Sequence, residues 1–417
     1  MKQLLSNPGL PALRESLKDV DALMRNGILT DEETGLKYYS GYQYRTLYDW
    51  DQYFEAILQI YMGWDGEYIK NGVLLFLMHQ KESGFIARSV PSTVCHEHEH
   101  VKPFLCRIAG LVIDAYGDAD WVLNDGVMTK LKRYLDYWLI DMDRDRNGLS
   151  EWESGPHTGM DNQHERAGYW RDHFCEGVDL NSYLVMEAQA FADLAEKMGR
   201  ADWAREYREI GRGRAQAMQR LWDDQEGFFF DRNMRHGEPM TSEYCGWGSN
   251  FNNVAFAPNP SYGQAYLRRP EHPDRIYFKY SGAFLPLYAG VATDAQAERM
   301  VNEHLLNENE FWTAHPVTSV AKCEEGYRDR QYFTDLGCNW RATTWIPLNY
   351  MIYHGLRRYG FRDAATALAG KTAQLVRTAG NREWYDTATG EGRGLDPFWG
   401  WSLLGHFIEW EDSLAAL

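Results

Sequence analysis

The sequence predicts an all-α protein built as an (α/α)6 toroid, a ring of six helical hairpins. Twelve segments carry helical periodicity, and most come in pairs separated by short turns that contain Gly or Asp. Strand-like runs are few and short, the best being residues 228–233, and no 34- or 40-residue repeat indicates a solenoid. The twelve segments are residues 11–25, 50–63, 66–79, 102–116, 120–139, 178–198, 201–222, 278–290, 293–305, 345–359, 361–378 and 396–412.

Two early segments show the periodicity most clearly. Residues 50–63 bring their apolar side chains to one face, and the pattern ends at Gly63. Residues 179–198 also carry one apolar stripe, and Asp179 is expected to be the N-cap of that helix. Both segments therefore predict helices that pack one face against a core.

A third segment, residues 346–359, has both a start and a stop signal. Pro347 lies near its beginning, where the missing N–H costs nothing. Arg357 and Arg358 occupy the last turn, and Gly360 follows it. The bounds of this helix are therefore predicted from both ends.

Long polar and aromatic stretches interrupt the helices. Connections longer than ~15 residues are uncommon unless they are functional. Their recurrence between hairpins is expected if loops at one end of the ring build a site. No Ser-, Gly- or Pro-rich linker divides the chain, so we expect one catalytic domain over residues 1–417. The stretches are residues 84–101, 141–177, 223–277, 307–344 and 379–395.

The composition limits the class of ligand. The chain carries 43 Lys+Arg against 60 Asp+Glu, a formal charge of −17, which argues against nucleic acid and anionic membranes as partners. It also contains 16 Trp, 26 Tyr and 18 Phe. Flat aromatic faces beside carboxylates suit a carbohydrate, whose C–H faces stack on aromatic rings. A small-molecule carbohydrate is therefore the expected ligand.

Targeting and redox signals are absent from the sequence. No basic segment followed by an apolar run opens the chain, and no stretch approaches the ~18 apolar residues of a membrane span. The six cysteines are scattered without a CxxC pair, which is typical of reduced thiols. We therefore expect a cytoplasmic protein that uses no cofactor and no metal ion.

Four clusters concentrate the residues that could carry chemistry. The strongest, residues 151–165, holds four carboxylates among Trp152 and two glycines. A second, residues 380–390, sets Glu383 beside two aromatic residues and precedes an aromatic run that contains Trp399. The other two are residues 48–52 and the segment 339–345, which holds Arg341 and Trp345.

These clusters fit glycoside hydrolysis. That reaction needs a carboxylic acid to protonate the leaving oxygen and a carboxylate to activate water. Two carboxylates on separate loops, with aromatic platforms, an Arg and amide hydrogen-bonders, supply this set. A surface or capping role is the ordinary alternative for each acid, and spacing alone does not choose between the two.

The sequence resembles glycoside hydrolase family 63 and the related trehalases from about residue 40 to 410. The family implies an (α/α)6 toroid and an inverting mechanism. Each matching motif is weak alone, and their order and spacing together carry the resemblance. The motifs are YDWD (48–51), GFI (84–86), WESG (152–155), GMDN (159–162), VDLNSYL (178–184), EFWT (310–313), NWRATTWIPLNY (339–350), EWYDTATG (383–390) and FWGWS (398–402).

The resemblance implies the two catalytic roles. The family's general acid is the Asp of an E-S-G-x-D segment, which matches Asp161. Its general base is the Glu that opens an E-x-Y-x-x-x-T-G segment, which matches Glu383. One departure affects the acid, because Asp161 lies eight residues after Glu153 rather than four, behind an insertion over residues 156–159. Glu153 is therefore the alternative acid.

The same resemblance implies a sugar-binding set. Trp50 and Asp51 are expected to hold the sugar that is cleaved. Arg341 is expected to bind a hydroxyl or to orient a carboxylate, and tryptophans are expected to form the walls. The full set of expected substrate-binding residues is Tyr48, Trp50, Asp51, Arg88, Trp152, Glu153, Asn162, Arg341, Trp345 and Trp399.

Two further motifs invite a metal interpretation. Residues 143–148 resemble the first half of a calcium loop, but the twelfth position from Asp143 is Ser154 rather than Glu, so a tight Asx-rich turn is favoured. Residues 96–100 alternate His and Glu, and a solvated loop is favoured there over a metal site. His100 could instead meet the aglycone, together with Lys102.

The substrate and its alternatives follow from the same resemblance. Members of this size resemble mannosylglycerate and glucosylglycerate hydrolases, whose anionic aglycone Arg88, Lys102 or Arg341 could receive. A disaccharide α-glucosidase of the trehalase type is the alternative. A sugar epimerase on the same toroid would need a pair of His facing the cavity. A non-catalytic carbohydrate-binding protein would need no paired carboxyl groups.

Overall fold

The computed structural model describes residues 2–43, 45–92, 97–163, 165–167, 175–234, 272, 274–324, 327–328 and 338–415. Its α-helices are α1 (Lys2–Leu5), α2 (Leu10–Ser16), α3 (Lys18–Met24), α4 (Asp51–Met62), α5 (Glu67–Met78), α6 (Leu105–Tyr116), α7 (Asp125–Asp136), α8 (Gly155–Thr158), α9 (Val178–Lys197), α10 (Ala201–Ala217), α12 (Leu285–Ala289), α13 (Asp294–Arg299), α14 (Ile346–Arg358), α15 (Arg362–Ala379) and α16 (Ile408–Ala415).

Short 3-10 and π turns extend several helices, and eleven short strands connect the loops of the described chain. The turns are η1 (Arg25–Gly27), η2 (Tyr137–Asp141), η3 (Met218–Leu221), η5 (Ser281–Phe284), η6 (Met300–Leu305) and η8 (Trp401–His406). The strands are β1 (Ile28–Thr30), β2 (Lys37–Tyr39), β3 (Leu47–Tyr48), β4 (Ser89–Val90), β5 (Cys175–Glu176), β6 (Trp222–Asp223), β7 (Phe228–Phe229), β8 (Arg232–Asn233), β9 (Thr343–Thr344), β10 (Trp384–Asp386) and β11 (Gly392–Arg393).

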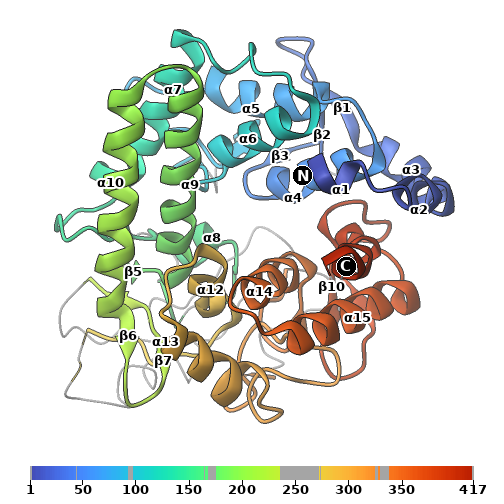
Figure 1. The fold of residues 1–417 in the computed structure, drawn as a ribbon, viewed down its shortest axis with the longest axis vertical. Helices are drawn as coiled ribbons and strands as arrows, with labels where there is room; N and C mark the ends of the chain where they lie inside the picture. The colour runs from blue at the N-terminus through green and yellow to red at the C-terminus, as the bar shows by residue number, and fades with distance from the viewer. Residues whose placement is uncertain are drawn as a thin grey trace.

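Six helical elements form a closed inner ring. In chain order α4 packs on α6, α6 on α9, α9 on α12, α12 on α14, α14 on η8, and η8 returns to α4. Figure 1 shows the chain passing once around this ring, from blue through green to red. Helices from opposite ends of the sequence therefore lie side by side, and the prediction of an (α/α)6 toroid is confirmed.

The remaining long helices form an outer layer. Helix α5 packs on α4 and α6, α7 and α10 pack on α9, and α15 packs on α14 and η8. Each of these outer helices precedes an inner one in the sequence, so the chain alternates between the layers (Figure 1). All twelve predicted helical segments correspond to helical elements of the described chain.

The differences from prediction lie mainly at helix ends. Helix α9 takes Gly177 as its N-cap, and Asp179 lies inside the first turn. The reason is that the carboxylate of Asp179 is engaged elsewhere, where it pairs with Arg166 at 2.7 Å and accepts a hydrogen bond from Trp152 at 2.8 Å. Asp179 thus anchors a neighbouring loop rather than its own helix.

Small antiparallel sheets hold the loops that follow the helices. Strand β3 pairs with β4, which sets Tyr48 opposite Ser89. Strand β10 pairs with β9 and β11, with Tyr385 opposite Thr344. Trp152 forms an isolated bridge with Cys175. Segments that the sequence marked as candidate site clusters are therefore fixed to other loops by backbone hydrogen bonds.

The core of the described chain is one hydrophobic cluster that joins both layers. Helix α4 is buried on every face because α2, α5, α6 and η8 all pack against it. It ends at Gly63, whose φ of 81° is a left-handed conformation that glycine adopts readily. No helix among the described residues combines the length and the apolar character of a membrane span.

Candidate active site

The predicted acid and base meet at a shared neighbour. Asp161 follows α8, and Glu383 directly precedes β10. The Cys338 Sγ donates a hydrogen bond to Glu383 Oε1 at 3.4 Å. The charge of Asp161 also acts on Glu383 and on the thiol of Cys338, which is an exposed residue. The toroid therefore brings together two carboxyl groups that are distant in the sequence.

Glu383 lies in a mostly apolar setting. Its side chain is 3% exposed, and its Oε2 accepts a hydrogen bond from the Leu395 backbone N–H at 3.0 Å. Gly394, with φ of 75°, lies directly beneath, and a Cβ there would collide with Glu383 Oε2. Burial raises the pKa of Glu383 to about 7, opposed by the hydrogen bonds from Leu395 and Cys338. A carboxyl with this pKa can exchange protons near neutral pH.

Asp161 lies in a charged setting. Burial raises its pKa to about 6, while the positive charges of Arg88 and Lys102 oppose this rise. Gly159, just before it, has φ of 81°, and a Cβ there would approach the Trp50 ring at 3.1 Å. The loop thus passes closely over Trp50, and a side chain at position 159 would push the two apart.

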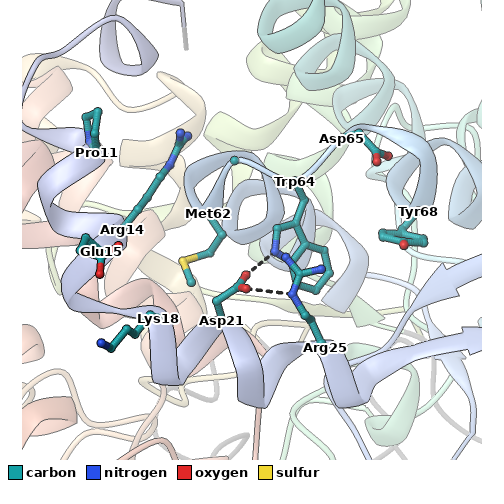
Figure 2. A pocket seen from close by; sticks show the side chains of 11 residues that line it. Pro11, Arg14, Glu15, Lys18, Asp21, Arg25, Met62, Trp64, Asp65 and Tyr68 are labelled. Carbon is teal, nitrogen blue, oxygen red and sulfur yellow. Dashed lines mark hydrogen bonds and ion pairs between the residues drawn. The ribbon is translucent and has the colours of Figure 1, made fainter.

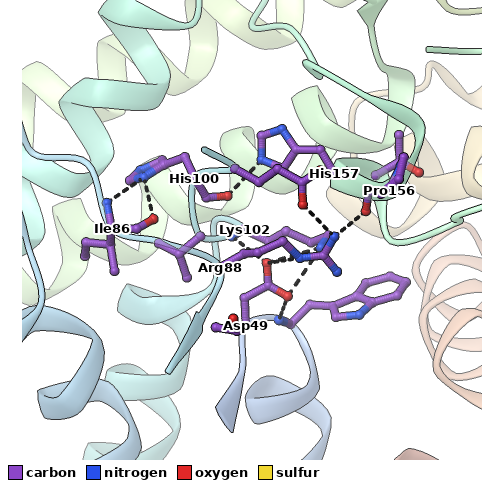
Figure 3. Close-up of polar contacts among 12 residues, drawn as sticks. Asp49, Ile86, Arg88, His100, Lys102, Pro156 and His157 are labelled. Atoms are coloured by element: carbon purple, nitrogen blue, oxygen red, sulfur yellow. Dashed lines mark hydrogen bonds and ion pairs between the residues drawn. The ribbon is translucent and has the colours of Figure 1, made fainter. Parts of the chain in front are cut away.

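A network of paired charges surrounds the two cations near Asp161 (Figure 3). The Lys102 Nζ lies 3.1 Å from Asp49 Oδ2, and both side chains are fully buried. The Arg88 Nη1 donates to Glu99 Oε2 at 3.1 Å and to the Pro156 carbonyl. Asp49 and Glu99 therefore fix the two cations beside the acid, and the Pro156 contact holds Arg88 to the start of α8.

Asp51 has an unused acceptor. It lies at the start of α4, is 4% exposed, and its pKa is raised to about 7 by burial and by the charge of Asp49. Within the described chain its Oδ1 has no hydrogen-bond partner. Buried polar atoms are rarely left unsatisfied. A sugar hydroxyl donated to this oxygen would satisfy it, as expected for a residue that binds the sugar.

Tyr48 is electrostatically coupled to the same group of residues. It is half-buried, and its phenol interacts with the charges of Arg88, Asp51 and Asp161. The register of β3 against β4 explains this position, because it sets Tyr48 beside the strand that follows Arg88. The structure therefore brings Tyr48, Asp51 and Arg88 together with Asp161.

Four of the tryptophans form one stack around Trp50. The Trp50 ring lies 5.6 Å from Trp340 and 6.3 Å from Trp401. Trp340 stacks on Trp345 at 3.6 Å with only 7° between the planes. Trp345 has no exposed surface, so it supports the site from behind Trp340 rather than offering a wall to a ligand.

Trp152 and Trp399 lie behind the site as well. Trp152 has no exposed surface, packs edge-on against Trp138 at 5.6 Å, and donates its N–H to Asp179. Trp399 is 7% exposed and donates its N–H to the Ser40 carbonyl at 2.8 Å. The expectation that these rings form exposed walls is not met in this conformation, because their surfaces are used for core packing.

Arg341 joins two site loops. It is fully buried, and its Nη2 lies 2.9 Å from Glu165 Oε2 and 2.9 Å from the Asn162 carbonyl oxygen. The Asn162 side chain in turn bonds Asn339 at 3.1 Å and the Trp340 backbone N–H at 2.8 Å. Arg341 and Asn162 therefore act as a brace between the acid loop and the segment that begins at Cys338.

Glu153, the alternative acid, is held in another ion pair. Its Oε1 lies 2.7 Å from Arg144 Nη2, and Arg144 also pairs with Glu151 at 2.6 Å. Glu153 is 2% exposed. A carboxylate that is neutralised by a guanidinium is a poor proton donor. The geometry therefore favours Asp161 as the acid.

The two metal-like motifs have ordinary structural roles. The carboxylate of Asp143 accepts from the backbone N–H groups of Asn147 and Gly148, both at 2.9 Å, so this loop is the Asx-rich turn that was favoured. His96 lies outside the described residues. His100 is fully buried, donating from Nε2 to the Tyr134 carbonyl at 3.1 Å. Among the described residues no group of His, Cys, Asp and Glu is arranged to hold a metal ion.

His100 and Lys102 do not reach an aglycone. Both side chains are fully buried, and Lys102 is paired with Asp49 (Figure 3). Burial lowers the pKa of His100 to about 3, so the imidazole is neutral. Phe85 and Tyr137 pack against its ring. The buried residues 99–102 therefore support the site from within the core.

A separate cavity of about 520 Å³ lies between α2, α3 and the end of α4 (Figure 2). None of the predicted site residues lines it. Arg14 donates to the Tyr61 carbonyl at 2.5 Å at the end of α4. Asp21 accepts from Trp64 at 2.5 Å and from Arg25 at 2.8 Å. These polar groups are satisfied by one another and stabilise the junction of the N-terminal helices with the ring.

Sequence reasoning missed Cys338, Asp49 and Glu99. Asp49 lies between Tyr48 and Trp50, which were predicted as site residues, but it was not predicted itself. Cys338 directly precedes the segment 339–345, but an isolated Cys carries no signal of its own. Glu99 belonged to a motif that was interpreted as a solvated loop. Proximity in sequence to a candidate cluster was the only signal for all three.

Comparison with known proteins identifies the family. A model of the mannosylglycerate hydrolase MGH1-like glycoside hydrolase domain matches residues 44–402. Mannosylglycerate hydrolase of Thermus thermophilus is 28% identical over 188 residues, which cover 44% of this chain and 34% of the relative. That of Rubrobacter radiotolerans is 28% identical over 235 residues, covering 55% and 42%. The matched segments thus span less than half the length of both relatives.

Solved structures share the architecture. The glycoside hydrolase family 63 mannosylglycerate hydrolase of Thermus thermophilus in complex with glucose superposes with a TM-score of 0.69 at 18% identity, covering 96% of this chain and 100% of that one. Neutral trehalase Nth1 of Saccharomyces cerevisiae gives 0.60 at 18% identity, covering 92% and 76%. These structures share the toroid, and the resemblance seen in the sequence is confirmed.

Proposed function

Because the chain belongs to the mannosylglycerate hydrolase MGH1-like glycoside hydrolase family, we propose that it is an inverting α-glycosidase. It releases a terminal sugar from small α-glucosides or α-mannosides, and residues 1–417 act as one catalytic domain. The observation that carries this proposal is that Asp161 and Glu383, on loops far apart in the sequence, lie close enough for the charge of Asp161 to act on Glu383. A non-catalytic sugar-binding protein would have no use for two neighbouring carboxyl groups whose pKa values are both raised.

The two carboxyl groups divide the proton transfers. Asp161, in its protonated form, donates a proton to the glycosidic oxygen as the bond to C1 breaks. A water molecule attacks C1 from the opposite face, and Glu383 accepts the proton that this water loses. The products are an alcohol and a sugar of inverted configuration. Inverting enzymes place the two carboxyl groups about 6.5–9.5 Å apart to leave room for the water.

The cleaved sugar is held by the neighbours of this pair. Asp51 Oδ1, which lacks a hydrogen-bond partner in the described chain, would accept from a sugar hydroxyl. Tyr48 and Trp50 lie beside it, and a ring can stack on the C–H face of the sugar. The cluster of these residues at one point supports cleavage of a single terminal residue.

Arg88 is the best candidate to recognise an anionic aglycone. Lys102 and Arg341 are fully buried in ion pairs, with Asp49 and Glu165 respectively. Arg88 is also ion-paired, with Glu99, but it is 7% exposed, its Nε has no hydrogen-bond partner within the described chain, and its charge acts on Asp161. The named activity of the relatives, mannosylglycerate hydrolysis, involves such a carboxylate. We therefore place a glycerate-like aglycone on the Arg88 side of Asp161.

Two other functions occur on a toroid of this kind. A disaccharide α-glucosidase is the second candidate, and the likeness to yeast neutral trehalase supports it. The mannosyl-oligosaccharide glucosidase GCS1 of Arabidopsis thaliana supports it as well. That relative is 21% identical over 296 residues, which cover 64% of this chain and 31% of the relative. A sugar epimerase is disfavoured, because His100 and His157 are fully buried and bonded to backbone carbonyls.

The test is a panel of α-glucosides and α-mannosides with glycerate, sugar and neutral aglycones. The purified protein is added to each, and proton NMR follows the first anomer that is released. We expect turnover of glycerate glycosides, with a β-sugar as the first product. The Asp161→Asn variant is the matched control. Release of an α-sugar first would contradict inversion, and no turnover of any member would contradict the proposed function.

A further inference from the structure

The backbone of a neighbouring loop holds the carboxyl group of Glu383 from one side. The Leu395 N–H donates a hydrogen bond to Glu383 Oε2 at 3.0 Å. Gly394, the residue before it, lies so close that a Cβ there would collide with Glu383 Oε2 and come within 2.6 Å of the Glu383 Cβ. The backbone at positions 394–395 therefore occupies the space on the Oε2 side of the carboxyl group.

Glycine is needed at position 394 for two reasons. Its φ of 75° lies in the left-handed region, which residues with a side chain rarely adopt. Any side chain there would also collide with Glu383. Gly394 therefore allows the loop to approach the predicted base closely enough for the next N–H to reach it.

Contacts on both sides of this hydrogen bond hold the loop to the base. Strand β10, which follows the base, pairs with β11, and Trp384 lies opposite Arg393. Arg382, which precedes the base, places its Nη1 3.1 Å from the Oδ2 of Asp396, which follows Leu395. The two segments are thus tied together before and after the hydrogen bond, so the fold sets the distance between the N–H and the carboxyl group.

The main chain of the base is fixed as well. The Trp401 indole N–H donates to the Glu383 carbonyl oxygen at 2.9 Å. Trp401 belongs to the aromatic stack around Trp50, whose ring lies 6.3 Å away. Glu383 is therefore anchored through its backbone to the sugar-binding cluster and through Oε2 to the Leu395 N–H.

The two carboxyl oxygens of Glu383 consequently differ. Oε2 accepts from a backbone N–H, which becomes a strong charge-assisted bond when the carboxyl group is ionised. Oε1 accepts from the Cys338 thiol, a weak donor, at 3.4 Å. A carboxylate oxygen has room for a second hydrogen bond. Since the backbone closes the Oε2 side, Oε1 is the oxygen that can bind a water molecule.

We propose that Gly394 and the Leu395 N–H are positioning groups, which bind Oε2 of the general base and leave Oε1 to take the proton from the attacking water. The oxygen of that water forms the bond to C1, its O–H bond breaks, and the proton moves to Oε1. The N–H also stabilises the ionised form of Glu383, the form that can accept a proton. This inference rests on the proposed function and adds two residues to it.

The sharpest test removes this N–H alone. An ester at Leu395, introduced with the corresponding α-hydroxy acid, replaces the N–H by oxygen and keeps the side chain. We expect kcat to fall about tenfold with little change in KM. The basic limb of the kcat/KM profile, near pH 7, should move upward by roughly half a pH unit, because the N–H lowers the pKa of Glu383. The acidic limb should stay in place.

The matched control is the same ester at Leu36. The Leu36 N–H donates to Thr34 Oγ1 at 3.3 Å in an exposed turn, so this ester removes a comparable bond outside the site. We expect the wild-type kcat and the wild-type pH profile for it. A basic limb that is unmoved in the Leu395 ester, or that moves equally in both esters, would overturn the inference.

A second variant tests the close approach of the loop. Gly394→Ala adds a methyl group against Glu383 and should lower kcat by about 10²-fold, as displacement of a reacting group does. Gly117→Ala imposes a similar backbone strain at φ of 72°, where no atom lies within 4 Å of the added Cβ. It should lower the free energy of unfolding and leave kcat unchanged. A Gly394→Ala variant with the wild-type kcat would overturn the inference.

A third measurement does not depend on activity. Carbon-13 NMR follows the carboxyl carbon of Glu383 in labelled protein, and the loss of its signal in Glu383→Gln assigns it. We expect a higher titration midpoint in the Leu395 ester than in the wild type. An unchanged midpoint would overturn the inference even in an active enzyme. Absence of turnover by the wild type on the whole panel would instead overturn the proposed function, so the two failures are distinguishable.

Discussion

Asp161 and Glu383 are the same functional group in two different surroundings. Asp161 faces Arg88 and Lys102, whose charges pull its pKa down against burial. Glu383 faces backbone N–H and the Cys338 thiol without a cation among its perturbing neighbours, and its pKa rises further, to about 7 against about 6. Burial raises both values from ordinary ones of 3.8 for Asp161 and 4.5 for Glu383, which already account for most of the difference, and the nearby cations offset part of the rise at Asp161.

The comparison has a consequence for the resting enzyme. Between about pH 6 and 7 a site with these two values holds one proton, which rests mainly on Glu383, so the working form with the proton on Asp161 is the minor one before substrate binds. The cations Arg88 and Lys102 lie on the Asp161 side, whereas the side of Glu383 is mostly apolar. A glycosidic oxygen bound next to Asp161 would displace water there and favour its protonated form.

The largest effect should come from removing either carboxylate. Asp161→Asn and Glu383→Gln should each lower kcat by about 10³-fold, because each removes one obligatory proton-transfer partner. Initial rates on the substrate found by the NMR panel measure this, and circular dichroism checks the fold. Azide should not restore turnover with retention. If Glu153→Gln is inactive while Asp161→Asn is active, the acid has been assigned to the wrong loop.

The pH profile of kcat/KM tests the two pKa values together. The active form needs a protonated Asp161 and an ionised Glu383. Activity falls below about pH 6, where both acids are protonated, and above about pH 7, where both are ionised. The optimum should lie between these values, with about a tenfold loss for each further pH unit. A flat profile from pH 5 to 8 would show that other groups limit the rate.

Replacing Arg88 tests how far the charged surroundings of Asp161 set its pKa. Arg88→Gln removes a positive charge that lowers the pKa of Asp161, so the acidic limb near pH 6 should move upward by up to about one pH unit. Hydrolysis of a glycerate glycoside should fall about tenfold more than that of a neutral glycoside. Arg88→Lys, which keeps the charge, is the matched control for the limb shift. An unchanged limb in Arg88→Gln would mean that the guanidinium does not act on the acid.

The smallest effect concerns stability. The pKa of Glu383 is raised in the folded state, to about 7 from an ordinary 4.5. The neutral side chain therefore makes its full contribution to the stability of the fold below about pH 4.5, and this contribution is lost as the pH rises toward 7. At pH 8 Glu383→Gln should unfold at a higher urea concentration than the wild type, with a free energy of unfolding that is larger by roughly 3 kcal/mol at most. At pH 4 its free energy of unfolding should show no gain. A gain that is equal at both pH values would point to packing instead.

The sequence was most informative about helices and least informative about which side of the ring a residue faces. Residues 346–359 carried a proline and a glycine at the right places, and α14 spans Ile346–Arg358. The ends of other helices differed where a side chain found a partner in another loop, as Asp179 did with Arg166. Such partners depend on tertiary contacts that periodicity does not encode.

The motifs predicted which residues lie near the site. They did not predict which of those residues are exposed to a ligand. Trp152 and Trp345 lie among the selected clusters, yet both have no exposed surface. A tryptophan that lines a pocket and one that supports it from behind look alike in sequence, because both lie beside polar residues and glycines. Arg341 was expected to bind a sugar hydroxyl or to orient a carboxylate, and it pairs with the carboxylate of Glu165. Cys338 had no motif of its own, and only the folded chain shows what it contacts.

The contact between α4 and η8 that closes the inner ring has a kinetic consequence. These elements are joined by most of the chain, and closing a long loop costs more entropy than closing a short one. During synthesis α4, which is buried on every face in the ring, emerges long before η8 can cover it. The apolar surface of α4 therefore stays exposed until η8 has been synthesised, and exposed apolar surface promotes the aggregation of larger proteins. Refolding from urea should therefore be slow and dependent on protein concentration, even though most of the secondary structure is local helix.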